Sequence, residues 1–350
     1  MFINAIRRLK TILIKYMPIL ECIPNFSEGN NKDVLKNIAQ AIEIVPDVYL
    51  LHQDTSASAN RTVFTFAGAP TAVIEAAFQA IKVAKEQIDM RLQKGAHPRI
   101  GATDVCPLVP LQDLSMQDAI YYADVLAKRV GEELAIPVFL YEYSQERAYR
   151  KRLPQIRSGQ YEQFKIKMTD PAWQPDYGPQ TFVESSGATV IGARALLVAF
   201  NISLDTKDAQ VAQQIANEIR SIGYVNEKGE RIAGLLPQLR AIGWYSSDFN
   251  CAQVSMNLLD YKKTSPLQVW QNCTAIASKY NVKLIGSELI GLMPEACLLE
   301  AGMNALQMAA AHKKDLLNAG IAYLKLDQVK PFNAQEKILE YALLAKLPQY

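Results

Sequence analysis

Strand-like and helix-like patterns follow the same order in both halves of the chain, and this repeat constrains the fold more than any other feature. Over 195–292, alternating apolar residues predict strands, and apolar residues three and four apart predict helices, in the order β-α-β-β-α-β. Over 18–144 the same order recurs with one additional helix and strand. It is typical of the split βαβ, or ferredoxin-like, sandwich, in which helices cover one face of an antiparallel sheet. The two halves show no obvious sequence identity, so the repeat is one of architecture.

Each sheet of this kind has one face without helices, and two such sheets facing each other would cover both faces and leave a cleft between them. The predicted strand 251–260 supports this interpretation, because its apolar residues alternate with Gln253, Ser255 and Asn257. The apolar side chains are expected to pack on helices, and the polar ones to line the cleft. An ordinary solvated sheet face explains the alternation equally well. We predict an α+β fold of two ferredoxin-like α/β subdomains with facing sheets.

Composition argues against several classes of partner. The 350 residues are enough for two domains, and 49% of them are hydrophobic and 21% charged, which is typical of a packed globular protein. A net charge of only +2 argues against nucleic acid, whose phosphates require a concentrated basic surface. The five cysteines lie far apart without a metal-binding spacing. We therefore expect reduced thiols, no metal ion and a cytoplasmic location.

The N-terminal segment 1–16 is basic and amphipathic, and it is too short and too charged to span a membrane. It lacks the uninterrupted apolar core and the cleavage site of a signal peptide. Two interpretations stay open for it: a helix on a membrane surface, or a chain that begins at Met17. No other stretch resembles a targeting segment, so we expect no membrane partner.

His97 is one of only three histidines, and it stands between two glycines in the motif GAHPRIG. Pro98 biases the preceding residue toward an extended backbone, which would hold the imidazole still. An imidazole, with a pKa of about 6.5, is suited to take and return a proton near neutral pH. Spacing alone leaves open whether His97 is an acid/base or the polar residue of a turn. The other two, His52 and His312, are expected near the end of a strand and of a helix.

The stretch 145–194 is the least regular part of the chain, and its length is unusual for a loop without a function. Basic residues in its first part include Arg147, Arg150, Lys151, Arg152 and Arg157. Aromatic residues, prolines and glycines follow, and this composition argues against disorder. We therefore expect the stretch to take part in function.

Six sequence blocks, in one order from about residue 19 to about residue 313, resemble the formiminotransferase family. They are LECIPNFSEG, NRTVFTFAG, IDMR with GAHPRIGATDVCPLVP, PDYGPQTFVESSGATVIGAR, AQVSMNLLDY and GSELIGLMP. The segment 330–343 also resembles the part that joins transferase to cyclodeaminase in the fused animal enzyme, and the sequence contains no cyclodeaminase. The resemblance implies a stand-alone transferase.

The resemblance also implies the reaction and the organisation of the chain. The expected activity transfers the formimino group of N-formimino-L-glutamate to the co-substrate tetrahydrofolate during histidine degradation. The expected fold has two α/β subdomains whose sheets face each other across a folate-holding tunnel. We expect an N-terminal extension at 1–16, subdomains at 17–190 and 191–313, and a helical tail at 314–350. A homodimer is also expected.

Several site residues follow from the resemblance. The family's catalytic histidine corresponds to His97. Ala96 and Ser186 depart from the family, in which glutamate often stands at the first position and, in the animal enzyme, tryptophan stands at the second. The folate-contacting segment corresponds to Gly178, Pro179, Gln180, Thr181, Phe182, Val183, Glu184, Ser185, Ser186 and Gly187.

The transfer reaction requires further polar groups. A carboxylate near the formimino group would stabilise its positive charge, and Asp54 and Asp104 are the candidates. Arginine suits the carboxylates of glutamate and of the folate tail. The candidate arginines are Arg61, Arg99 and Arg194, and the candidate neutral hydrogen-bonding residues are Asn25 and Asn60. A turn residue at Asp104 and surface ion pairs at the arginines stay open as alternatives.

Two other functions stay open. The first is a transferase that uses N-formyl-L-glutamate, which differs from the formimino donor only by =O in place of =NH. The second is a folate-binding protein without turnover, against which the intact His97 argues. The sequence has no phosphate-binding glycine loop, no G-x-S-x-G elbow and no metal-ligand cluster, which argues against nucleotide, serine-hydrolase and metal chemistry.

Overall fold

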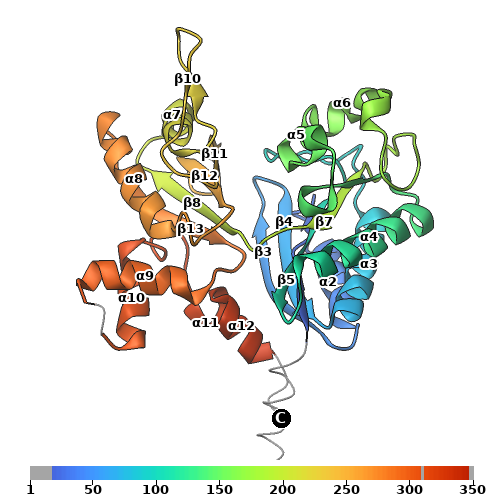
Figure 1. Ribbon diagram of the computed structural model, residues 1–350, viewed down its shortest axis with the longest axis horizontal. Coiled ribbons are helices and arrows are strands. Elements are labelled where there is room, and N and C mark those ends of the chain that lie inside the picture. The colour runs from blue at the N-terminus through green and yellow to red at the C-terminus, as the bar shows by residue number, and fades with distance from the viewer. Residues whose placement is uncertain (1–17, 309–310, 347–350) are drawn as a thin grey trace, which may run out of the picture. The chain divides into compact units, whose positions relative to one another are not determined.

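The computed structural model describes residues 18–308 and 311–346 (Figure 1). They divide into two compact units. Unit 1 runs to Ala195 and includes the described residues from Leu343 on, and unit 2 runs from Leu196 to Ala342. The expected N-terminal extension lies outside the described residues. None of the described helices is long and apolar enough to cross a membrane.

Unit 1 is built on a seven-stranded sheet. Its strands are β1 (Ile19–Cys22), β2 (Asn25–Phe26), β3 (Val48–Ser56), β4 (Arg61–Gly68), β5 (Thr103–Gln112), β6 (Val138–Leu140) and β7 (Thr189–Ala193). Strand β4 pairs with β3 on one side and with β1 and β2 on the other, and β5 continues the sheet from β1 and β2 to β7 and β6. The β5–β7 and β6–β7 pairings are parallel, and the others are antiparallel.

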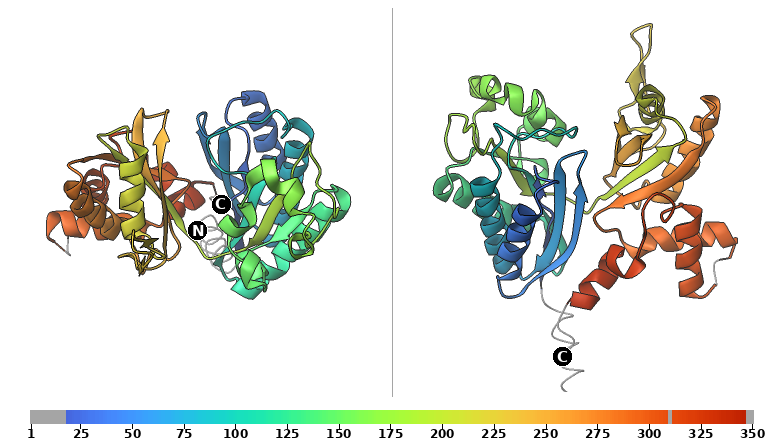
Figure 2. Two further views of the ribbon diagram at one scale, coloured as in Figure 1. Left: turned by 90° about the horizontal axis from the view of Figure 1, so that it is seen from above. Right: turned by 180° about the vertical axis from the view of Figure 1, so that it is seen from behind.

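Three long helices, α2 (Lys32–Glu43), α3 (Pro70–Gln87) and α4 (Met116–Glu133), lie together on one face of this sheet (Figures 1 and 2). Local sequence sets where each begins. The Asn31 side chain caps α2, Pro70 stands in the first turn of α3, and Ser115 forms a capping box with Asp118 at the start of α4.

The strands of unit 1 bury alternate residues against these helices. Glu21 on β1 and Thr65 on β4 belong to the other face of the sheet, because neighbouring residues of a strand point to opposite faces. Part of that face is covered by α5 (Leu153–Arg157) and α6 (Gln160–Lys167), which pack on Val105 and Val190. The core on the helical face contains Leu20, Cys22, Phe64, Phe66 and Leu108.

Unit 2 holds a four-stranded antiparallel sheet in the order β11-β12-β8-β13. Its strands are β8 (Val198–Leu204), β11 (Leu239–Ser246), β12 (Cys251–Leu258) and β13 (Leu284–Ile290). A small hairpin, β9 (Tyr224–Val225) with β10 (Arg231–Ile232), stands apart from it. The helices are α7 (Ala209–Ile219), α8 (Pro266–Lys279), α9 (Glu295–Leu306), α10 (Lys313–Tyr323) and α11 (Ala334–Lys337). Helix α12 (Leu339–Lys346) begins in unit 2, and its residues from Leu343 on belong to unit 1.

The apolar side of the alternation predicted for 251–260 is confirmed in β12. Its four apolar residues lie in one core with the buried faces of α7 and α8, so the polar residues between them face away from these helices. Those apolar residues are Ala252, Val254, Met256 and Leu258.

The predicted mixture of helices and strands is confirmed, and several local predictions are wrong. The strand expected over 18–24 is interrupted after Cys22, because Pro24 has no N–H to give to a ladder. The irregular stretch 145–194 contains α5 and α6. His52 lies inside β3 rather than near its end. His312 precedes α10 as its N-cap residue rather than ending a helix.

Glu21 gives the stability of unit 1 a pH dependence. Its side chain is fully buried, and neither carboxyl oxygen has a hydrogen-bond partner among the described residues. Burial raises the pKa of Glu21 to about 7, although the charge of Arg194 opposes the shift. The unfolded chain therefore loses this proton first as the pH rises, and the folded state is destabilised between about pH 4.5 and pH 7 and remains so above it.

We expect Glu21→Gln to stabilise the protein at pH 8 by up to about 3 kcal/mol and to have little effect near pH 4, where the carboxyl is protonated in both states. Urea unfolding followed by circular dichroism at both pH values measures this difference. Glu43→Gln, at an exposed position on α2, is the control and should show no such difference. Equal effects of Glu21→Gln at pH 4 and pH 8 would contradict the prediction.

Candidate active site

The loop at 93–102, here called the His97 loop, joins the end of α3 to β5 and is held by very close backbone contacts. A Cβ added at Gly95 would lie 2.3 Å from the carbonyl oxygen of Ala59, and one added at Gly101 would lie 2.1 Å from that of Ala188. Only glycine permits such an approach. The two glycines therefore fix the loop between the β3–β4 turn and the segment before β7.

Asn60 ties the His97 loop to the β3–β4 turn. Its Nδ2 donates to the carbonyl oxygen of Lys94 at 2.8 Å, and its Oδ1 accepts from the backbone N–H of Gly29 at 2.8 Å. Gln93 Nε2 donates to the carbonyl oxygen of Asn60 at 3.1 Å. Asn60 has a φ of 45°, in the left-handed region that asparagine adopts more readily than most residues. In these contacts Asn60 holds the turn and the loop together.

The half-buried His97 has a defined tautomer. Its Nδ1 lies 2.8 Å from the carbonyl oxygen of Pro98, and because a carbonyl only accepts, Nδ1 carries the proton. The lone pair is then on Nε2. Burial, together with the charges of Arg61 and Arg157, lowers the pKa of His97 well below its usual value. His97 is therefore a neutral imidazole with an available base at Nε2 near neutral pH.

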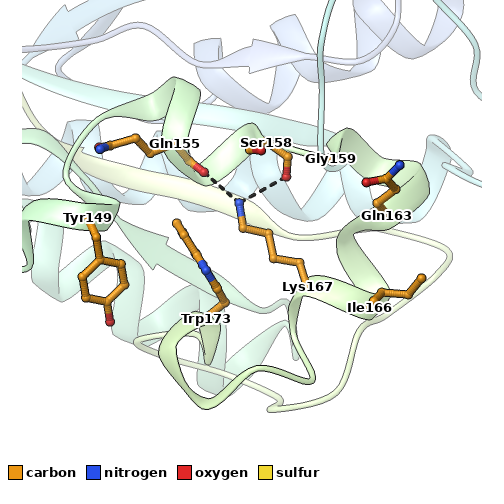
Figure 3. A pocket seen from close by; sticks show the side chains of 8 residues that line it. All are labelled: Tyr149, Gln155, Ser158, Gly159, Gln163, Ile166, Lys167 and Trp173. Carbon is orange, nitrogen blue, oxygen red and sulfur yellow. Dashed lines mark hydrogen bonds between the residues drawn. The ribbon is translucent and has the colours of Figure 1, made fainter.

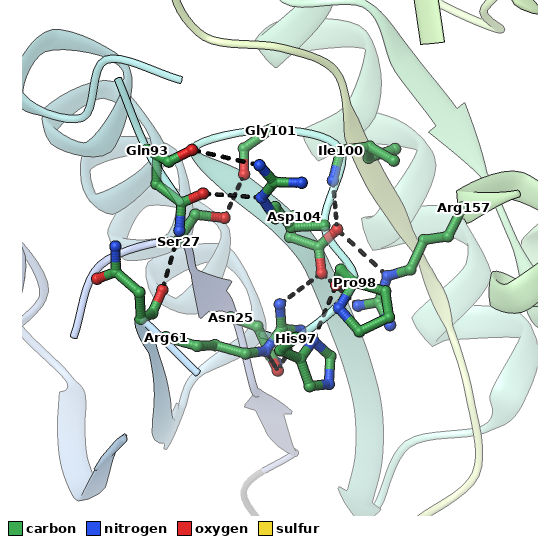
Figure 4. Close-up of polar contacts among 12 residues, drawn as sticks. Asn25, Ser27, Arg61, Gln93, His97, Pro98, Ile100, Gly101, Asp104 and Arg157 are labelled. Atoms are coloured by element: carbon green, nitrogen blue, oxygen red, sulfur yellow. Dashed lines mark hydrogen bonds and ion pairs between the residues drawn. The ribbon is translucent and has the colours of Figure 1, made fainter. Parts of the chain in front are cut away.

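Asp104 lies next to His97 and is the centre of the polar cluster in Figure 4. Arg61 Nη1 donates to its Oδ2 at 2.7 Å, Arg157 Nε donates to its Oδ1 at 3.2 Å, and Arg157 Nη2 also donates to Oδ2. The backbone N–H of Ile100 donates to Oδ1 at 3.0 Å. Burial alone would raise the pKa of Asp104, but the charges of Arg157 and Arg61 outweigh it and lower that pKa.

Arg61 also holds the Asn25 side chain in place through hydrogen bonds. Its Nε and Nη2 donate to Asn25 Oδ1 at 3.1 Å and 2.7 Å, and Asn25 Nδ2 donates to the carbonyl oxygen of Ile23 at 2.9 Å. Burial lowers the pKa of Arg61 to about 10, so it stays charged at neutral pH. Two guanidinium groups around the Asp104 carboxylate leave one net positive charge beside His97, and an anionic group is therefore favoured there.

Arg99 is already paired within the protein. Its Nη2 and Nη1 donate to the two carboxylate oxygens of Glu162 at 2.7 Å and 3.0 Å, and its Nε donates to Gln93 Oε1 at 2.8 Å. A bidentate pair of this kind is strong and directional. Arg99 therefore fastens the His97 loop to α6.

The end of the segment 178–187 lies against the His97 loop. A Cβ added at Gly187, which has a φ of 68°, would lie 2.2 Å from the carbonyl oxygen of Ile100. The backbone N–H of Ala102 donates to the carbonyl oxygen of Ser186 at 2.8 Å. The structure thus brings the end of this segment against the loop, with Ser186 and Gly187 buried and Gln180, Thr181 and Glu184 exposed.

The remaining predicted site residues, Asp54 and Arg194, take part in other contacts. Asp54 is buried on β3, and its Oδ2 lies 3.0 Å from His52 Nε2. Arg194 directly follows β7, and its Nη1 donates to the carbonyl oxygen of Ala195 at 2.9 Å.

Sequence reasoning missed Arg157 as a site residue. It was visible only as one of several basic residues in the stretch 145–194, and its neighbour in space, Asp104, is distant in sequence. The turn between α5 and α6 also escaped prediction, although it places Arg157.

A surface pocket beside α5 and α6 is lined by residues that do not include His97, and its lysine has a structural role (Figure 3). Lys167 Nζ donates to the carbonyl oxygens of Gln155, Ile156 and Ser158 at 2.7, 2.7 and 3.1 Å, and it lies 3.7 Å from the ring centroid of Trp173. All three donors of the ammonium are used, so this lysine caps the end of α5 rather than presenting a reactive amine. In 18–308 and 311–346 no three His, Cys, Asp or Glu residues are arranged to hold a metal ion.

Two protein-family models match the chain. The N-terminal subdomain of the formiminotransferase domain matches residues 19–194, and the formiminotransferase domain matches residues 199–344. Together these matches account for most of the sequence, including both units.

Individual relatives agree with these matches. A glutamate formimidoyltransferase from Streptococcus pyogenes serotype M1 is 41% identical over 290 residues, which are 83% of this chain and 94% of that protein. One from Thermoplasma acidophilum is 38% identical over 86% of this chain and 96% of its own length. The formimidoyltransferase-cyclodeaminase of Gallus gallus is 41% identical over 93% of this chain, but the match spans only 60% of that longer protein.

We expect Asp104→Asn to lower the free energy of unfolding by about 3–5 kcal/mol, because Arg61 and Arg157 would then be buried without a counter-charge. Urea unfolding at pH 7 measures this loss. Asp89→Asn is the matched control, because it removes the half-exposed partner of the exposed Arg91 and should change stability little. Similar small effects of both substitutions would refute the central role of Asp104.

Proposed function

The chain belongs to the formiminotransferase family, and on that premise we propose that it is a glutamate formimidoyltransferase that moves the formimino group of N-formimino-L-glutamate to tetrahydrofolate. The observation that carries this proposal is the neutral His97, which has its lone pair on Nε2 and interacts electrostatically with the net positive group of Arg61, Asp104 and Arg157. Such a site supplies a base and binds an anion, and this reaction needs both.

His97 moves one proton in the proposed reaction. The N5 amine of tetrahydrofolate attacks the formimino carbon, and an N5–C bond forms in a tetrahedral intermediate. Nε2 of His97 takes the proton that N5 loses, and it returns this proton to the glutamate nitrogen as the C–N bond to glutamate breaks. The fixed Nδ1–H bond to Pro98 keeps Nε2 as the acting nitrogen throughout.

The arginines bind and orient the donor in this proposal. Arg157 uses Nε and Nη2 on Asp104, which leaves Nη1 for a carboxylate of the glutamate donor. Asp104 is a positioning residue, because it holds both guanidinium groups without facing the reacting carbon itself. Arg99 positions the His97 loop through Glu162. Asp54, buried beside His52, is proposed to face the cationic formimino group.

We further propose that the folate lies along 178–187, since the end of this segment contacts the His97 loop. The strand orders of both sheets support ferredoxin-like subdomains, for which the proposed bounds are 17–190 and 191–313. A folate tunnel between facing sheets, Arg194 as a ligand of the folate tail, a homodimer and a cytoplasmic location belong to the same proposal.

Assays with each donor in turn, following tetrahydrofolate conversion spectrally, test the proposed function. We expect turnover with N-formimino-L-glutamate, and we expect His97→Ala to lower kcat by about 10²–10⁴-fold while folate still binds. Undiminished transfer by His97→Ala would refute the role of His97. Turnover with N-formyl-L-glutamate alone would replace the proposed donor, and folate binding without any turnover would replace the enzyme by a binding protein.

The fall of kcat/KM in acidic buffer should report the protonation of His97. Because its pKa is lowered, we expect kcat/KM to stay high below pH 6.5 and to fall only in more acidic buffer. Arg157→Gln removes a positive charge that disfavours the imidazolium, so the pKa of His97 and the acid limb should both shift to higher pH. NMR titration of the histidine ring nitrogens measures the pKa directly. Arg91→Gln, at an exposed arginine, is the control, and an unshifted pKa in Arg157→Gln would contradict the electrostatic argument.

A further inference from the structure

Two buried polar side chains, Gln93 and Arg99, stand on either side of His97 in the sequence. Gln93 is 9% exposed and Arg99 is 5% exposed, whereas residues 94–96 between them are exposed. Burying polar atoms of this kind is costly unless they are hydrogen-bonded. The contacts of these two side chains therefore decide whether this part of the His97 loop keeps one conformation.

Gln93 and Arg99 bind each other and close the segment 93–99 around His97. Arg99 Nε donates to Gln93 Oε1 at 2.8 Å, and Arg99 Nη2 donates to the carbonyl oxygen of Gln93 at 3.2 Å. The other end of the Gln93 amide, Nε2, donates to the carbonyl oxygen of Asn60 at 3.1 Å (Figure 4). Both ends of the amide are used, so its orientation is fixed.

Arg99 connects the closed segment 93–99 to the start of α6. The backbone N–H of Tyr161 donates to the carbonyl oxygen of Arg99 at 2.9 Å, and the guanidinium of Arg99 binds both carboxylate oxygens of Glu162. Arg157 lies three residues before the first residue of α6. The closed segment and Arg157 are therefore held at the same end of one helix.

We propose that Gln93 is a positioning residue for the group transfer. Its amide holds Arg99, and through Arg99 it keeps the imidazole of His97 fixed relative to Arg157 and the Asp104 carboxylate. Gln93 itself moves no proton and forms no bond to the reacting carbon. Precise placement matters, because a displacement of about 1 Å can lower a rate about 10²-fold. This inference rests on the proposed function, because that function makes His97 the base.

Steady-state kinetics of Gln93→Leu tests this role. Leucine is close to glutamine in size but removes both hydrogen-bonding ends, so we expect kcat to fall about 10–10²-fold. The KM for the formimino donor should change much less, because Arg157 is unaltered. Gln79→Leu is the matched control, because the Gln79 amide donates to Glu75 on the same helix, α3, and kcat should keep its wild-type value. Undiminished kcat in Gln93→Leu would overturn the proposal.

Glu162→Gln, at an exposed position of α6, tests the link through Arg99 from its other side. It weakens the charged contact of Arg99, and we expect a smaller loss of kcat than in Gln93→Leu. Because both substitutions act through one guanidinium, the double variant should lose less than the product of the two single losses. Losses that multiply would show independent effects and would overturn the link.

NMR of the histidine ring nitrogens separates positioning from a general loss of stability, and it needs no turnover. The wild-type protein should show one neutral tautomer of His97, protonated at Nδ1. In Gln93→Leu we expect both tautomers and a pKa closer to 6.5, because a loosened loop exposes the imidazole to water. His97→Ala identifies the signals.

The combined outcomes distinguish this inference from the proposed function. Wild-type tautomer and pKa in Gln93→Leu, with only a lower free energy of unfolding in urea, would assign Gln93 a purely structural role and overturn the inference. If the wild-type protein transfers the formimino group in that case, only this inference fails. If the NMR changes as predicted but the wild-type protein transfers no group, the proposed function fails and the hold of Gln93 on His97 stands.

Discussion

The buried carboxylate of Asp104 is the interaction on which the rest of the proposed site depends. It accepts hydrogen bonds from Arg61 on β4, from Arg157 at the end of α5 and from the backbone of Ile100 in the His97 loop. Parts of the chain that are distant in sequence therefore meet at one side chain. Two guanidinium groups share a single carboxylate. Burial, together with the remaining positive charge, lowers the pKa of His97 and keeps it neutral, and that charge favours an anion beside it.

Close contacts between the His97 loop and neighbouring backbone shape the proposed site as much as charge does. Gly95, Gly101 and Gly187 bring the His97 loop so close to its neighbours that an added Cβ would overlap a carbonyl oxygen. The loop is consequently fixed on two sides before any substrate binds. A single bond from Nδ1 of His97 to the next carbonyl oxygen then decides which ring nitrogen can act as a base. A flexible loop would offer both nitrogens and would have to be ordered first.

The buried polar groups of this protein differ in whether they are paired and in how they affect its stability. Those around Asp104 are paired, and the pairing makes them both stabilising and electrostatically active. Among the described residues neither carboxyl oxygen of Glu21 has a hydrogen-bond partner, and the burial of this side chain costs stability whenever it is charged.

The sequence by itself determined the mixed α/β class, most of the element order and the family, because these depend on local periodicity and ordered motifs. It also singled out His97, whose glycines and proline are neighbours along the chain. Only the tertiary structure decided that Arg157 joins Arg61 on Asp104 and that Arg99 pairs with Glu162. Pairings between residues tens of positions apart leave no periodic pattern in a sequence, since they arise from how strands and helices pack.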